Sequence, residues 1–152
     1  MREIKFRGKP SEDDEFIYGF YGKKPCKHCI GYCETTELEH FIISTKNYDP
    51  EGNFTIFHDT KVLRETVGQY TEKSDSESKE IYDGDIVDFT VFDMFGNDTQ
   101  HTGLVEWHNC EFLLTDKFGD SWNLFWVLQQ DDEAKIIGNI HDNPELLEVT
   151  ND

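Results

Sequence analysis

Residues 81–92 have the sequence Ile-Tyr-Asp-Gly-Asp-Ile-Val-Asp-Phe-Thr-Val-Phe. Gly84 sits between two aspartates, and glycine adopts the positive φ of a tight turn at no steric cost. Beyond it, apolar and polar residues alternate, so that Val87, Phe89 and Val91 share one face of an extended chain. The stretch therefore predicts a turn that leads into a long, half-buried β-strand.

The residues after this strand predict more short strands. Turn-forming Gly, Asp and Asn separate them, which is typical of an all-β barrel or sandwich. We expect strands at 102–107, 111–115 and 135–140, with a tight turn at 108–110. By analogy of fold, residues 81–152 are predicted to form a small SH3-like β-barrel.

Two further segments complete this region. Residues 122–128 fit either another strand or a short helix; as a strand, they would carry apolar side chains on both faces and be buried on both sides. Asn143 precedes Pro144, as an N-cap precedes proline at the first helical position. We therefore expect a short C-terminal helical turn.

Residues 1–70 are predicted to form β-hairpins. Residues 4–7 and 16–22 would make the first pair of strands, and residues 40–45 and 54–58 the second, joined through the turn-forming segment 49–53. Residues 71–80 are polar and contain three serines, which favours a loop between the two parts. The fold class is thus mostly β.

Composition supports a folded but acidic chain. Of 152 residues, 36% are hydrophobic, which is low, but 14% are aromatic, and large rings bury enough area to build a core. The net charge is −18; residues 1–76 contribute −3 and residues 77–152 contribute −15. Such a field repels phosphate backbones, so we expect no binding to nucleic acid.

The sequence favours a cytoplasmic protein, in the cytosol of a bacterial host. The N-terminus is charged and alternating and lacks the apolar segment of a signal peptide. Apolar runs are all shorter than the ~20 residues that span a bilayer, so no membrane partner is expected. In a cytosol the four cysteines would stay reduced.

The insert at residues 23–33 contains candidate metal ligands, namely Cys26, His28, Cys29 and Cys33. Two cysteines spaced Cys-x-x-Cys can bind one tetrahedral Zn²⁺, so these residues could hold a structural zinc with a further ligand from His40, His58 or Cys110. The second Cys-x-x-Cys pair of many such sites is absent. This favours the alternative, a loop with reduced thiols and no cofactor.

Local signatures of catalysis are absent from the sequence. It has no nucleophile elbow, phosphate-binding loop or paired-histidine zinc motif. His101, His108 and His141 fall in expected turns, where exposure to solvent is the usual state. Asp85 and Asp88 would point to opposite faces of their strand, which argues against a divalent-metal cluster. We therefore expect no enzyme and no catalytic residues.

Several segments, in order from one terminus to the other, resemble the YopX family of bacteriophage and prophage proteins. They are residues 4–8, 18–19, 66–71, 79–87, 105–107 and 137–147. The resemblance implies a phage or prophage origin, a mainly β structure and no assigned activity.

The chain departs from this family pattern at two places. Similar proteins usually have a glycine where this chain has Glu72, and an Asn-Gly turn where it has Ser76-Glu77-Ser78. The Cys-containing insert at 23–33 is also outside the core pattern. These departures concern the conformation of one loop and leave the expected fold unchanged.

The sequence thus predicts a non-enzymatic protein-interaction or self-assembling module whose partner is a protein or a second copy of the chain. Exposed aromatic residues and the acidic C-terminal half motivate this hypothesis. Two alternatives stay open: an acidic decoy that mimics nucleic acid for a host protein, and a metal-dependent enzyme.

Overall fold

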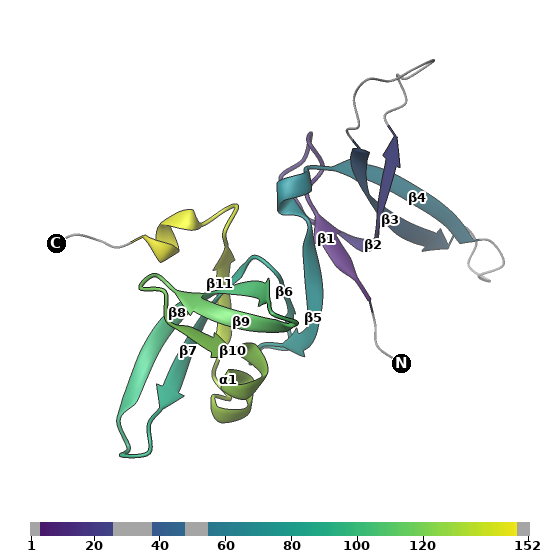
Figure 1. Cartoon of the computed structure of the whole chain (residues 1–152). Helices are drawn as coiled ribbons and strands as arrows, with labels where there is room; N and C mark the ends of the chain where they lie inside the picture. The colour runs from purple at the N-terminus through teal and green to yellow at the C-terminus, as the bar shows by residue number, and fades with distance from the viewer. Residues whose placement is uncertain (1–3, 26–37, 48–54, 149–152) are drawn as a thin grey trace. The chain divides into compact units, whose positions relative to one another are not determined.

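The computed structural model describes residues 4–25, 38–47 and 55–148 (Figure 1). These residues form two compact units, residues 1–69 and 70–152. β-strands dominate both units, and unit 2 adds one short α-helix. The predicted mostly β fold is confirmed.

Unit 1 is an antiparallel sheet with the strand order β4-β3-β2-β1. Its elements are β1 (Phe6–Gly8), β2 (Ile17–Pro25), β3 (Leu38–Asn47), β4 (Thr55–Val62) and the 3₁₀ turn η1 (Arg64–Thr66). The register pairs Arg7 with Tyr18 and His40 with Val62, so both expected hairpins are present. The first residues of β5 (Gly68–Ser74) then pair with β1.

The core of unit 1 is small. Phe41, Ile42 and Val62 are its buried apolar residues in the described part of the chain. At Gly19 the neighbouring strand comes so close that a Cβ atom would lie 2.2 Å from the carbonyl oxygen of Ile43. Only glycine fits there, which explains the Tyr-Gly pair in the second strand.

Unit 2 contains a five-stranded antiparallel sheet with the strand order β10-β9-β8-β7-β11, curled as in a half-barrel. The elements of this unit beyond β5 are β6 (Glu80–Tyr82), β7 (Asp85–Phe92), β8 (Asp98–His108), β9 (Glu111–Asp116), β10 (Ser121–Asn123), α1 (Leu124–Gln130), β11 (Lys135–Asn139) and η2 (Pro144–Leu147). The rest of β5 pairs with β6.

The alternation that predicted β7 is confirmed. Val87 and Phe89 belong to the buried core with Leu114, Leu124 and Val127, and Val91 packs against it. The turn before the strand has Gly84 at φ 87°, as its sequence requires. The buried carboxylate of Asp85 accepts a hydrogen bond from the backbone N–H of Tyr82 at 2.8 Å, which fixes that turn.

Residues 124–130 are a helix, so the strand alternative for this segment is wrong. Asn123 caps it, since its side chain accepts a hydrogen bond from the backbone N–H of Trp126 at 2.9 Å. Leu124 and Val127, three residues apart, face the core, and Phe125 and its neighbour Trp126 are exposed. The segment is therefore buried on one face only.

The polar stretch 71–80 is not simply a loop, because β5 extends to Ser74 and β6 begins at Glu80. Asp75 holds the connection between them. Its Oδ1 accepts hydrogen bonds from the backbone N–H groups of Glu77 and Lys79, each at 2.9 Å, and its Oδ2 accepts one from the buried N–H of Ile136 at 3.1 Å. A buried carboxylate thus orders a segment whose composition suggests a loop.

Glu72 and Ser78 adopt positive φ values of 64° and 66°. Glu72 stands where similar proteins usually have glycine, and Ser78 lies in the segment that stands for their Asn-Gly turn. The backbone keeps the left-handed conformation that glycine favours, although both residues carry a Cβ.

Candidate functional site

The sheet of unit 2 has a two-stranded extension. β11 pairs with β7 only as far as Asp88, and β9 pairs with β8 only as far as Gly103. Among the described residues, 89–102 therefore form a hairpin with a neighbouring strand on neither side, which we call the hairpin arm. In Figure 1 the ends of β7 and β8 extend past the other strands of their sheet.

The tip of the arm presents apolar side chains to solvent. The exposed fractions are 41% for Phe92, 97% for Met94 and 87% for Phe95. Asp93 holds the turn, because its carboxylate accepts hydrogen bonds from the N–H groups of Phe95 and Asn97 and from the Asn97 side chain. The bond from the Asn97 side chain, followed by the backbone bond from Asn97, lowers the pKa of Asp93.

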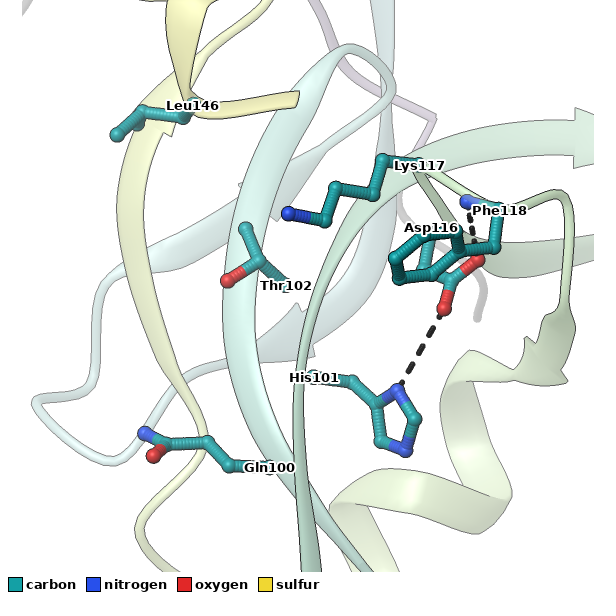
Figure 2. Close-up of a pocket in the computed structure, with 7 residues that line it drawn as sticks. All are labelled: Gln100, His101, Thr102, Asp116, Lys117, Phe118 and Leu146. Carbon is teal, nitrogen blue, oxygen red and sulfur yellow. Dashed lines mark hydrogen bonds and ion pairs between the residues drawn. The ribbon is translucent and has the colours of Figure 1, made fainter. Parts of the chain in front are cut away.

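A hollow of about 200 Å³ lies beside β8 at the base of the arm (Figure 2). It is lined by Gln100, His101, Thr102, Asp116, Lys117, Phe118 and Leu146. Three of these residues come from β8, three from the end of β9 and the turn after it, and Leu146 from η2.

A histidine–aspartate pair forms one wall of the hollow. Figure 2 shows the His101 imidazole pointing toward Asp116, with 3.5 Å between Nδ1 and Oδ2. Asp116 is held in place by the backbone N–H groups of Phe118 and Asp120, which donate to its Oδ1 at 2.9 and 3.0 Å. The His101 ring stacks on Phe89 and packs against Trp122 at 4.4 Å between centroids. The expected turn position of His101 is therefore wrong, because it lies within β8.

The residues that line this hollow do not form a nucleophilic triad. The hydroxyl in the lining belongs to Thr102, and its Oγ1 is 3.5 Å from Asp88 rather than bonded to His101. The volume is also below the about 300–1,000 Å³ of most ligand pockets. The hollow offers a cation on Lys117, amide groups on Gln100 and the apolar side chains of Phe118 and Leu146, which suits the binding of a side chain from another protein.

A wider, open hollow of about 540 Å³ lies beside the arm. Its lining consists of Thr90, Phe92, Asp98, Gln100, Gln130, Asp131, Asp132 and Glu133. Asp131 is structural, since its Oδ2 accepts from the backbone N–H of Thr90 at 2.7 Å and its Oδ1 from that of Glu133. The hollow lacks a cationic lining residue, so its electrostatic field favours a positively charged ligand.

The candidate zinc ligands Cys26, His28, Cys29 and Cys33 lie outside the described residues. Of the further ligands considered, His40 is on β3 and His58 on β4, where it pairs with Ser44. This register separates the two histidines by four positions, roughly 13 Å along the strands, too far to share one ion. Within the described ranges, no three His, Cys, Asp or Glu side chains form a group that could hold a metal.

His40 has a structural partner. The hydroxyl of Tyr21 is hydrogen-bonded to its Nδ1, and the two rings stack. Partial burial lowers the pKa of His40, and the nearby charges of Lys23 and Arg64 lower it further. A neutral imidazole can accept the bond from Tyr21, so this histidine has a role within the sheet.

The zinc hypothesis stays a prediction with a direct test. We expect substoichiometric zinc in the purified chain, because a second Cys-x-x-Cys pair is absent from the sequence. Metal analysis by mass spectrometry measures it, with Cys110→Ser, an exposed thiol of unit 2, as the control for adventitious metal at a lone cysteine. One zinc ion per chain that is lost in Cys29→Ser would contradict the expectation.

Comparisons with known proteins show a family and, separately, a similar fold. A family model described as YopX protein matches residues 5–148. The chain is also similar to a solved structure, the protein EF1440 from Enterococcus faecalis, with 20% identity, a TM-score of 0.54 and coverage of 96% of this chain and 99% of that one. No curated protein matches. None of the described helices is long and apolar enough to cross a membrane.

Proposed function

The chain belongs to the YopX family, and on this premise we propose that it is a non-enzymatic module that binds a protein partner through the hairpin arm of unit 2. The proposal includes a phage or prophage origin and a role in the bacterial cytosol, both of which rest on the family resemblance and the sequence. It also leaves the arm free to bind a second copy of the chain.

The observation that carries the proposal is the apolar tip of the arm. Met94 and Phe95 have almost no protein neighbours to bury them, with exposed fractions of 97% and 87%. Aromatic residues and methionine are enriched at protein interfaces, because burying them against a partner gains free energy. Maintaining such side chains on an ordered turn has no benefit for the fold of unit 2 itself.

The absence of catalytic machinery in the described hollows also supports binding over catalysis. His101 has an orienting carboxylate, but neither a nucleophile nor a deep pocket accompanies it. The wider hollow is open to solvent and acidic.

The double variant Met94→Ser/Phe95→Ser is expected to reduce partner capture by about tenfold or more, because it removes the two most exposed apolar side chains of the arm. The measurement is quantitative mass spectrometry of bacterial proteins retained on the immobilised full chain. Light scattering of the purified protein distinguishes a separate partner from self-association.

The matched control is Phe57→Ser, which removes a 66% exposed aromatic residue from β4 of unit 1. We expect this variant to retain the same proteins as the wild type. If the tip variant and the control cannot be told apart from the wild type, the arm is not the binding surface and the proposal fails.

A second candidate function is an acidic decoy for a host protein that binds nucleic acid. The net charge of −15 over residues 77–152 favours it. A decoy of this kind should bind a basic partner with an affinity that falls steeply as salt rises, since its surface charges are screened. Binding that is insensitive to salt would remove the decoy hypothesis but would be compatible with a mainly apolar interface at the arm tip.

A further inference from the structure

One edge of the hairpin arm has unpaired backbone groups. The backbone N–H of Thr90 donates to Asp131, so it points away from β8. Thr90 faces Gln100 in the register, and two opposite residues of an antiparallel pair direct their backbone groups either toward each other or both outward, away from the ladder between them. The N–H and C=O of Gln100 therefore point away from β7, toward the side where β9 has already ended.

This edge has no strand beside it in the described part of the chain. β9 pairs with β8 from His108 to Gly103, and β8 continues to Asp98 without a partner on that side. The opposite edge of the arm is different, because Asp131 occupies the N–H of Thr90. Natural proteins usually protect long free edges, since an exposed edge accepts an added strand.

Side-chain sites flank the free edge. The hollow lined by His101, Phe118 and Leu146 lies beside it, and Phe118 is largely exposed. Successive side chains of an added strand would point to opposite faces, so that alternate residues face the hollow. An apolar side chain there would contact Phe118 and Leu146.

Charge indicates what kind of strand fits. Asp98 and Gln100 also line the acidic hollow, together with Asp131, Asp132 and Glu133. Lys117 is the one cation that lines either hollow. A second copy of this chain would bring a like net charge of −18, of which residues 77–152 contribute −15, whereas Lys or Arg side chains would be attracted to the acidic hollow.

We infer that the β8 edge of the hairpin arm binds an extended peptide segment of a basic protein partner, with alternating apolar and Lys or Arg residues, by strand addition at Gln100. This inference rests on the proposed function and names the partner's chemistry and the binding mode. The apolar residues fill the hollow beside Phe118, and the cations face the acidic hollow.

The test uses the full chain and a short synthetic peptide of alternating Lys and Val, with Kd measured by isothermal titration calorimetry for every variant and the contact mapped in the wild type by NMR at the backbone amide of Gln100. A peptide of alternating Glu and Val is expected not to bind. A Lys–Val peptide that is N-methylated at every second residue keeps its charge and side chains but lacks donors on one edge, so it should also lose binding.

Two variants at one position separate backbone pairing from side-chain contacts. Gln100→Pro removes the outward N–H, and proline is tolerated on an edge strand where that N–H is outside the existing ladder. Gln100→Ala removes the side chain and keeps the N–H. We expect Kd to rise about tenfold in Gln100→Pro and by a clearly smaller factor in Gln100→Ala, which loses only the contribution of the side chain to the hollows.

Failure of this inference is distinguishable from failure of the proposed function. Strand addition is overturned if Gln100→Pro binds the Lys–Val peptide as tightly as the wild type does and the wild type binds the N-methylated peptide equally well. The variant Met94→Ser/Phe95→Ser still tests binding by the arm in that case. If the Lys–Val peptide does not bind, the inference that the partner segment is basic is overturned. Sedimentation that shows a dimer abolished by Gln100→Pro would overturn it too, because a second copy would then occupy the edge.

Discussion

The substitution Asp75→Ala is expected to lower the free energy of unfolding of unit 2 by about 3–5 kcal/mol. Asp75 is buried, and its carboxylate accepts three backbone hydrogen bonds, from Glu77, Lys79 and Ile136. Alanine would leave these donors without their acceptor, and the N–H of Ile136 is shielded from water. Urea unfolding followed by tryptophan fluorescence measures the loss, because all three tryptophans are in unit 2.

The matched control for this prediction is Asp93→Ala at the tip of the arm. Asp93 makes the same kind of bonds to the backbone of its turn, but these groups are exposed and water can replace the carboxylate. We expect a much smaller change in the unfolding midpoint than for Asp75→Ala. Equal effects of the two substitutions would show that the buried position of Asp75 does not determine its contribution.

Phe89→Ala is expected to destabilise unit 2 by about 3–5 kcal/mol, because it leaves a cavity in the core. Phe89 is 2% exposed, and its ring contacts both His101 and Trp122. Its removal would also loosen the wall of the hollow beside β8. Chemical unfolding gives the stability, and the near-ultraviolet circular dichroism of the tryptophans reports the packing of Trp122.

Phe92→Ala is the control, since it changes the same type of residue on the same strand at a position that is 41% exposed. The expected loss is below about 1 kcal/mol. A loss at Phe92 as large as that at Phe89 would contradict the assignment of the two residues to the arm tip and to the core.

Period-two alternation was sufficient to predict most strands of unit 2. Residues 87–91 alternate because one face of that part of β7 is more deeply buried than the other, and the sequence carries that constraint directly. It left α1 undecided between a strand and a short helix, since Leu124 and Val127 match a helical spacing over only two turns and Trp122, Leu124 and Trp126 match a strand equally well. The capping bond of Asn123 decides the outcome, and a single asparagine is a weak signal in sequence alone.

The wall of the hollow could not be predicted from the residues near it. His101 is preceded by Asp98-Thr99-Gln100, which has the composition of a turn. Its packing against Phe89 and Trp122 comes from the β7–β8 register and from the position of β10, which are properties of the folded sheet. The number of residues between His101 and Asp116 is set by the length of the β8–β9 hairpin. This spacing does not correspond to a motif that can be recognised in the sequence.

The two departures from the family pattern lie at places where the backbone has an unusual conformation. Glu72 and Ser78 are both at positive φ, so replacement of the usual glycines marks places where the backbone has a special conformation. The sequence did not show how this conformation is kept. The hydrogen bonds that Asp75 makes to Lys79 and Ile136 provide a physical reason, since they fix the connection between β5 and β6.

Amide hydrogen exchange along β8 in the isolated full chain tests the free edge most directly. We expect fast exchange at Gln100, whose N–H points to solvent, and slow exchange at His101, whose N–H is directed into the ladder with Phe89. Similar protection of both amides would contradict it, because the edge that is proposed to receive a partner strand would then already be occupied.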